Sequence, residues 1–298
     1  MAATTRRLVL LGGAAAVAGC VPRAPGVPVT RGDEFEGGIG GTGIVGIVTA
    51  LDAASVQVGG LTLALRDAPA PARGDFVSVV ARGSGDGLAV QTLRVDPPLV
   101  GTARVADGRM QVNGVAVRKE PGVAPPRDGE RVAVGGVWNG GAVVASRIVP
   151  ATDGPDVVAG TVDRRGGVRI GGVPVRAASL PSTGRYARVV GRYDGTALAG
   201  RIAQVDRFDG RAVARLAVEG YLEPSPRAPG LRIAGLGHSF DRGVVPDEVG
   251  ARRALYLGPY DGRFDARVAV PLPDNADARA AVLQDGAQAA ARANGVAL

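Results

Sequence analysis

The chain has few residues of the types that carry most protein chemistry. Of its 298 residues one is cysteine, one is histidine and 4% are aromatic. A single cysteine cannot form an intramolecular disulfide, and one cysteine with one histidine does not supply the usual ligands of a zinc site. No G-x-S-x-G nucleophile motif and no D-x-[DN]-x-[DN]-G calcium loop occurs. We therefore expect no catalytic residue, no metal and no cofactor.

The one histidine, His238, stands close to Ser239 and Asp241 in the sequence. A hydrolase triad brings its base, nucleophile and carboxylate together from separated positions, whereas these three residues are nearly adjacent. We interpret His238 as a turn or strand-edge residue. An envelope hydrolase is the weakest alternative, because it would need carboxylates that converge on His238.

Long apolar runs are also missing, and the longest one stands at the N-terminus. Residues 8–18 are apolar apart from two glycines and follow Arg6 and Arg7. This run is too short to span a bilayer and has the layout of a secretory signal. The Val17–Cys20 stretch resembles the lipobox of bacterial lipoproteins, in which the cysteine is acylated and the peptide is cut just before it. We predict a signal peptide over residues 1–19 and lipidation of Cys20.

The export signal has two readings. Residues 5–10, with Arg6 and Arg7, resemble a twin-arginine signal, but an ordinary Sec signal also begins with basic residues. Several acyl chains on Cys20 would anchor the chain stably to a membrane. Val21 departs from the aspartate of the inner-membrane retention pattern. We therefore expect a lipid-anchored protein of the cell envelope that faces the periplasm or the surface, and we favour the outer membrane.

The net charge is positive, at +7 for the whole chain and +5 once Arg6 and Arg7 are removed. Basic proteins bind nucleic acids or acidic glycans. Here the basic residues are scattered, with no run of five or more like charges, and the enrichment in Arg, Ala, Gly, Val and Pro is typical of a GC-rich genome. An exported chain does not meet cytoplasmic nucleic acid. We therefore expect neither nucleic acid nor nucleotide as a partner.

Glycine is abundant, and its densest run is GGIGGTG at residues 37–43. The run matches G-x-G-x-x-G, but a dinucleotide-binding turn needs a buried strand before it and a helix after it. A polar stretch precedes the run and a β-like stretch follows it. We interpret residues 20–41 as a Gly/Pro-rich tether. Ile39 and Thr42 could pair as an extra edge strand.

Internal repeats organise the rest of the chain. Four segments share an opening strand with a glycine, two short strands, a loop, and a hairpin whose turn is Asx-Gly. Such turns tolerate the positive φ that tight hairpins need. The four turns are Asp86-Gly87, Asn139-Gly140, Asp194-Gly195 and Asp261-Gly262. The predicted repeats span residues 42–98, 99–151, 152–206 and, in divergent form, 207–273.

The fourth strand of each repeat alternates clearly. In residues 187–193, apolar and glycine residues share one face and Arg188 and Arg192 the other, which predicts one buried and one solvated face. The 132–138 and 254–260 stretches have the same pattern. Five strands in 50–60 residues close naturally into a small barrel. We predict an all-β protein of four tandem five-stranded OB-like barrels.

Residues 274–298 form a different tail. Pro271 and Pro273 end the last strand, and Asp274 or Asn275 could cap an alanine-rich helix over residues 276–293. Gly286 weakens that helix. We predict a short C-terminal helix, with a frayed tail as the alternative.

The repeats resemble the domain of unknown function 5666 family, which consists of small β-rich repeats in exported bacterial proteins. The resemblance lies in residues 56–60 (VQVGG), 74–77 (GDFV), 128–134 (DGERVAV) and 145–148 (ASRI). It covers about residues 42–270, well for three repeats and loosely for the fourth. The family implies no established activity, so it assigns no functional residue to this chain.

Aromatic residues recur just before three of the hairpin turns, as Trp138, Tyr193 and Tyr260. They could form a row that stacks on sugars or bases, or one buried plug at the end of each barrel. The scarcity of aromatic residues favours the plug.

The sequence favours a non-enzymatic interaction or structural module, anchored to the membrane by lipid. The main alternative is an envelope lipoprotein that binds glycan or peptidoglycan, for which Trp138, Tyr193 and Tyr260 are the candidate residues. Envelope proteins or glycans are the expected partners.

Overall fold

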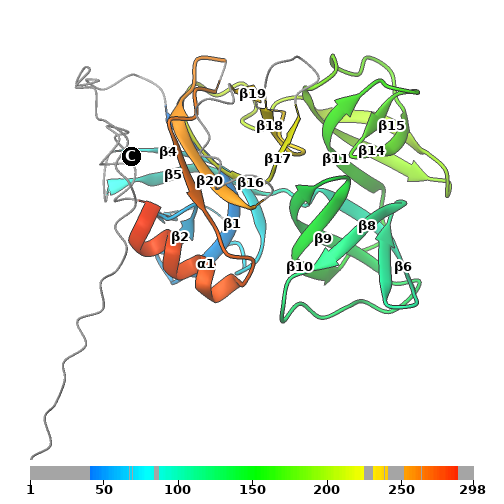
Figure 1. The fold of residues 1–298 in the computed structure, drawn as a ribbon, viewed down its shortest axis with the longest axis horizontal. Coiled ribbons are helices and arrows are strands. Elements are labelled where there is room, and N and C mark those ends of the chain that lie inside the picture. Colours follow the sequence, from blue (N-terminus) through cyan, green and yellow to red (C-terminus); the bar gives the residue numbers. More distant parts are fainter. Residues whose placement is uncertain are drawn as a thin grey trace, which may run out of the picture. The chain divides into compact units, whose positions relative to one another are not determined.

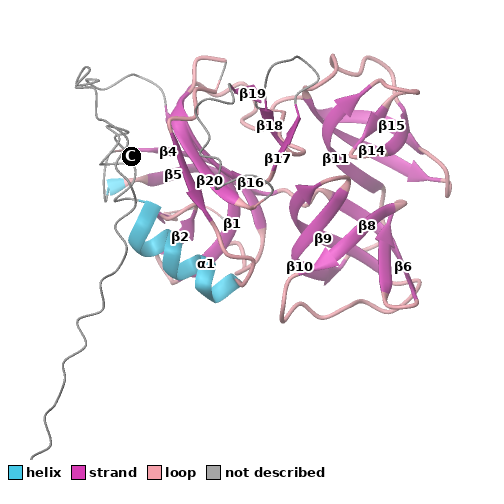
Figure 2. Cartoon of the chain, in the orientation of Figure 1, coloured by secondary structure: helices cyan, strands magenta, loops and turns pink. Residues whose placement is uncertain are grey.

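A computed structural model describes residues 41–287, except residues 67, 69, 84–86, 225–230, 238, 241–251 and 263. The described residues belong to one compact unit, Glu34–Leu298. Arg6, Arg7, Cys20 and His238, and most of the glycine run, lie outside them. The fold is mostly β, and Figure 2 shows helix chiefly near the C-terminus. No described helix has the length and apolarity needed to cross a membrane.

We call residues 42–98, 99–151, 152–206 and 207–273 segments 1 to 4; as domain boundaries they stay a prediction. The strands of segment 2 form a closed five-stranded barrel with the order β6-β7-β8-β10-β9, in which β9 pairs again with β6 (Figure 1). Closure satisfies the backbone of every strand and leaves no open sheet edge. The strands are β6 (Leu99–Ala106), β7 (Arg109–Val112), β8 (Val115–Lys119), β9 (Arg131–Asn139) and β10 (Ala142–Pro150).

Segments 1 and 3 repeat this cyclic order of pairing with shorter ladders. In segment 1 the link between the third and fifth strands is a single pair, Ala64 with Ala89, and in segment 3 it is two pairs. The strands of segment 1 are β1 (Gly41–Leu51), β2 (Ser55–Val58), β3 (Leu61–Ala64), β4 (Phe76–Arg82) and β5 (Ala89–Val95). Those of segment 3 are β11 (Asp156–Asp163), β12 (Arg169–Ile170), β13 (Val173–Arg176), β14 (Tyr186–Tyr193) and β15 (Leu198–Gln204).

Segment 4 differs from the prediction of a fourth barrel, because its described strands are divided between two sheets. Strands β16, β20 and β21 continue the sheet of segment 1, while β17, β18 and β19 form a small sheet of their own. Four tandem OB-like barrels are therefore not confirmed. The strands are β16 (Val213–Gly220), β17 (Leu222–Pro224), β18 (Leu231–Ile233), β19 (Ser239–Phe240), β20 (Ala254–Pro259) and β21 (Val268–Pro271).

Strand β1 joins segment 1 to segment 4. It pairs in parallel with β16 and antiparallel with β4, and nine of its residues, from Gly41 to Thr49, are buried. Thr42 is thus in the interior of a sheet, and the edge strand expected for it is wrong. Gly43 has a packing reason, since a Cβ atom there would lie 2.7 Å from the Phe208 ring.

The single buried face predicted for the fourth strand fails in β20. Leu255 and Leu257 pack in a core cluster with the apolar residues of segment 1, while Ala254 and Tyr256 pack in a second cluster on the other face. Both faces are covered because β20 lies inside a shared sheet rather than on a separate barrel. The hairpin partners expected from the sequence are nevertheless correct, as in β9–β10 and β14–β15.

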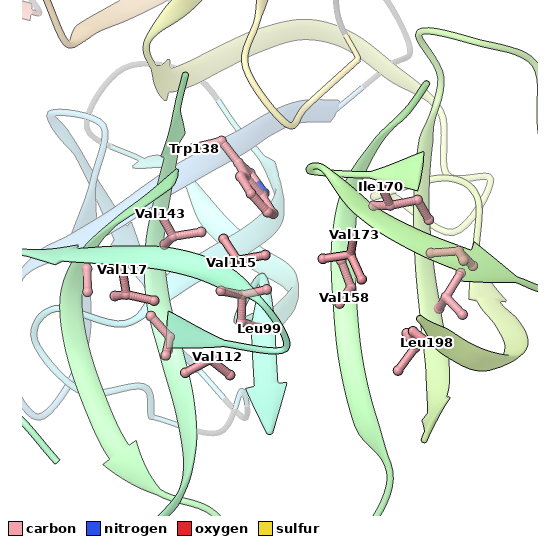
Figure 3. Close-up of a cluster of buried hydrophobic side chains, with 14 of the residues drawn as sticks. Leu99, Val112, Val115, Val117, Trp138, Val143, Val158, Ile170, Val173 and Leu198 are labelled. Atoms are coloured by element: carbon pink, nitrogen blue, oxygen red, sulfur yellow. The ribbon is translucent and has the colours of Figure 1, made fainter. Parts of the chain in front are cut away.

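A third core cluster spans segments 2 and 3 (Figure 3). The segments share a sheet through the antiparallel pairs of Val157 with Val100 and Val158 with Leu99. In Figure 3, Trp138 lies on the side of the cluster formed by segment 2, facing the strands of segment 3. A continuous core of this kind holds the two segments together through the burial of apolar surface.

The predicted C-terminal helix is present as α1 (Ala276–Val282), followed by one π-helical turn, Leu283–Ala287. Asn275 is the N-cap, and its side chain accepts hydrogen bonds from the amides of Asp277 and Ala278. This cap satisfies two amides that have no partner within the helix. Leu283 is buried in the core cluster of segment 1. The predicted residues beyond 287 lie outside the described part of the chain.

A glycine in the fourth strand allows the fifth strand to approach closely. In segment 2 a Cβ atom on Gly136 would overlap the carbonyl oxygen of Val144, next to a register shift between Ala145 and Arg147. Gly191 and Gly258 meet the same obstacle at the carbonyls of Ala199 and Asp265. Glycine therefore recurs in the fourth strand because a backbone carbonyl of the following chain occupies the place of a side chain.

We expect Gly136→Ala to lower the free energy of unfolding by about 1–3 kcal/mol, because the added methyl group forces the β9–β10 ladder apart. Gly154→Ala is the control. Gly154 is exposed and its Cβ would meet only a carbonyl at 3.9 Å, so the change should stay within about 0.5 kcal/mol. Urea denaturation measures both. Equal stabilities of the two variants would contradict this explanation.

Candidate functional site

The three aromatic residues singled out by the sequence do not form one stacking row. Trp138 is 4% exposed, and its indole N–H donates to the carbonyl of Ala159 at 2.9 Å. Its ring packs so closely on Gly171 and Gly235 that neither position has room for a side chain. Trp138 is therefore a wedge between segments rather than a plug in its own barrel, and it has no free face for a ligand.

Tyr260 and Tyr193 lie in different surroundings. Tyr260 is half-buried against the core cluster that contains Tyr256. Tyr193 is half-buried at the edge of the cluster shared by segments 2 and 3, and it also lines a cavity. Both residues stay candidates for binding, and Tyr193 is the one that lines a described cavity.

The cavity is a polar cleft of about 340 Å³ between the β6–β7 hairpin of segment 2 and the β14–β15 turn of segment 3. Ligand sites usually have volumes of about 300–1,000 Å³ and a mostly apolar lining. This one is small and has no aliphatic side chain in its lining. The polar cleft is lined by Thr102, Arg104, Gln111, Asn113, Gly114, Asp156, Tyr193, Asp194 and Gly195.

The floor of the polar cleft is fixed by bonds between the two segments. The Arg131 guanidinium pairs with Asp156 at 2.6 Å, and the other Asp156 oxygen accepts the Tyr193 amide at 2.7 Å. The buried Asn113 side chain donates to the carbonyls of Val100 at 2.9 Å and Val157 at 3.1 Å. Asp156 and Asn113 are thereby engaged in structure and are not available as catalytic groups.

The wall contributed by segment 3 is also fixed. The Tyr193 hydroxyl donates to the carbonyl of Gly195 at 2.9 Å, and a Cβ atom on Gly114 would lie 2.5 Å from that hydroxyl. One Asp194 oxygen accepts hydrogen bonds from the Thr196 hydroxyl and from the amides of Thr196 and Ala197. These bonds hold the pKa of Asp194 below its usual value, with the Thr196 hydroxyl the largest contribution. Asp194 is therefore an anion that shapes the turn.

Two side chains on the opposite wall are exposed. Arg104 and Gln111 are paired across the β6–β7 ladder, so their side chains stand next to one another on the same face. Among the described residues neither side chain has a hydrogen-bonding or ionic partner. The cleft thus combines a rigid floor with an arginine and an amide that can accept a ligand.

A second group of polar residues is buried completely. Glu120, Glu219, Arg253 and Arg279 form a cluster, here the buried quartet, whose side chains are at most 2% exposed. Arg253 pairs with Glu120, and with Glu219 at 2.8 Å, while Arg279 reaches Glu120 at 2.7 Å and Glu219 at 3.4 Å. Glu219 also accepts the Ile47 amide at 2.9 Å. Two carboxylates and two guanidiniums make the quartet neutral overall.

A hydroxyl group lies near the buried quartet. Tyr221 donates to Asp274 at 3.0 Å, and burial raises the pKa of Tyr221 to about 12. The phenol is therefore protonated at neutral pH and serves as a donor. The quartet joins the second segment, β16, the residue just before β20 and helix α1, which gives it a structural role.

Asp96 is the centre of a third polar group. It is 1% exposed and pairs with Arg188 at 2.7 Å and Arg207 at 3.0 Å. The Arg207 guanidinium stacks on the Tyr186 ring with its central carbon 4.0 Å from the ring centroid. Arg188 and Arg192 were expected on a solvated face. Arg192 is exposed, whereas Arg188 keeps only 18% of its side chain exposed because it bonds to Asp96 and to the carbonyl of Pro97.

The residues of the polar cleft and of the buried clusters could be predicted from the sequence only in part. Tyr193 was singled out by its place before an Asp-Gly turn, but no motif marked Arg104, Gln111 or the buried quartet. Within the described ranges no group of three or more His, Cys, Asp and Glu residues could hold a metal ion.

Comparison with known proteins identifies no relative. No family model, no curated protein and no solved structure matches this chain.

We expect Arg253→Met to lower the free energy of unfolding by about 3–5 kcal/mol, because Glu120 and Glu219 would share one guanidinium in a site buried from solvent. Arg267→Met is the matched control. Arg267 pairs with Asp265, but both side chains are about half exposed, so the loss should stay below about 1 kcal/mol. Chemical denaturation measures both, and similar losses would show that the quartet adds no stability.

Proposed function

We propose that this chain is a lipid-anchored protein of the bacterial cell envelope whose OB-like units form a rigid, non-enzymatic interaction or structural module. The observation that carries the proposal is the buried quartet. It ties together segment 2, segment 4 and the C-terminal helix through side chains at most 2% exposed. Such contacts are lost entirely if one partner moves away, so they favour a platform of fixed geometry over a chain of independent domains.

The tandem OB-like repeats and the family are part of this proposal. The cyclic strand pairing within segments 1 and 3 supports small barrels related to that of segment 2. Segment 4 then derives from the same plan but has opened, because β16 pairs with β1. Membership of the domain of unknown function 5666 family is proposed on the repeat motifs.

The location is proposed from the N-terminal sequence. Arg6, Arg7, the following apolar run and Cys20 support export and acylation, by either the twin-arginine or the Sec route. Val21 supports the outer membrane. The predicted tether, without Gly41, which belongs to β1, would then separate the folded units from the lipid.

A second candidate function is glycan binding, and the polar cleft is the observation that favours it. Its lining offers hydroxyl, amide and guanidinium groups beside the Tyr193 ring. Trp138, which is buried, is no longer part of this candidate. We do not propose the envelope hydrolase, because it depended on His238, which lies outside the described residues.

The anchor is tested by Cys20→Ala. We expect the wild-type chain to incorporate labelled palmitate and to sediment with membranes, and the variant to do neither, since only Cys20 offers a thiol. Val21→Ala keeps the cysteine and should behave as the wild type does. The anchor would be refuted if neither the wild type nor the Cys20→Ala variant incorporates palmitate and the variant still sediments with membranes.

The module itself is tested by crosslinking in intact cells and identification of the captured molecules. Specific envelope proteins are the expected result. Recovery of glycan alone would favour the second candidate over the first.

A further inference from the structure

We propose that the polar cleft binds a carbohydrate that carries a carboxylate or phosphate group, with Arg104 as the residue that holds the anionic group. This inference rests on the glycan-binding candidate and specifies its site and its ligand. It does not depend on the lipid anchor.

The chemistry of the lining points to a hydrophilic ligand. Six of the nine lining residues have a hydroxyl, amide or charged side chain, and the other three are two glycines and Tyr193. Sites for apolar ligands are lined mostly by aliphatic and aromatic residues. A sugar matches this cleft better, because its hydroxyl groups pair with Thr102 and Gln111 while a ring face packs on an aromatic side chain.

The distribution of charge points to an anionic ligand. The acids of the cleft are already engaged, since Asp156 pairs with Arg131 and Asp194 pairs with Arg176 at 3.4 Å. Arg104 has no ionic partner within the described part of the chain. Its planar guanidinium matches carboxylate or phosphate oxygens with two parallel hydrogen bonds.

The wider surroundings reinforce this charge. Residues 99–206, which build both walls, contain 15 arginines and lysines against 9 acidic residues, a net charge of +6. The remainder of the chain from Cys20 onward carries a net charge of −1. The basic character of the protein is thus concentrated in the two segments that enclose the cleft, and such a field draws anionic ligands to it.

The geometry is prepared before a ligand arrives. Asn113 and Arg131 fix segment 2 to segment 3, and the Tyr193 hydroxyl is held by Gly195. A rigid site loses little conformational entropy on binding. Gln111, beside Arg104 on the ladder, is placed to donate to the same ligand.

The experiment uses the full-length chain in mild detergent and titration calorimetry with three oligosaccharides of equal length. One carries carboxylates (tetragalacturonate), one is a phosphorylated maltotetraose, and the neutral maltotetraose is the control. We expect one of the acidic sugars to bind at least 10-fold more tightly than the neutral sugar. The tighter of the two acidic sugars identifies the anionic group.

Arg104→Gln should weaken the binding of that sugar at least 10-fold. Arg82→Gln removes the same charge from an exposed site in segment 1 and should leave binding within 2-fold. Equal losses in the two variants would mean diffuse attraction and would overturn the proposal, as would equal binding of the neutral sugar or no binding at all. Tighter binding of a single-stranded oligodeoxynucleotide would replace glycan by nucleic acid. None of these outcomes touches the anchor or the crosslinked partners, so the two proposals fail separately.

Discussion

The buried quartet is the contact on which the arrangement of the C-terminal half depends. Glu219 stands on β16, which pairs with β1, while Arg279 is supplied by α1 and Glu120 by the loop after β8. Taking four charges out of water is costly, and the cost is offset only while all four remain together. The pairing of first and last segments, the docking of the helix and the position of segment 2 are therefore mutually dependent.

Local patterns predicted the local structure well. The hairpins that turn at Asn139-Gly140 and Asp194-Gly195 form as expected. Their formation depends on the turn residues and the adjoining strands, which interact over a few residues. The Asn275 cap is another example. The merging of segments was not predictable in this way, since β1 and β16 are separated by more than 150 residues, and their pairing has no signature beyond the apolar character of both.

Single arginine residues show a similar limit. Arg188 alternates with apolar neighbours, a pattern that places it in solvent when one strand is considered alone. Its partial burial comes from its ion pair with Asp96 in the linker after β5, which no period within β14 can reveal. The place of Arg104 in the polar cleft was equally hidden from the sequence. Tyr193 was recognisable from its position before a turn, but Arg104 faces it from another segment.

The polar cleft and the structural ion pairs are physically linked. Arg131 holds Asp156, and Asp156 in turn holds the Tyr193 amide, so the bond that joins segments 2 and 3 also positions the aromatic wall. Trp138 secures the same junction from the apolar side through Ala159. A cleft built at such a junction has its width set by the packing of both segments, whereas the exposed side chains of Arg104 and Gln111 on its other wall form no hydrogen bond or ion pair with the described residues. A substitution of either residue therefore leaves the bonds of the junction intact.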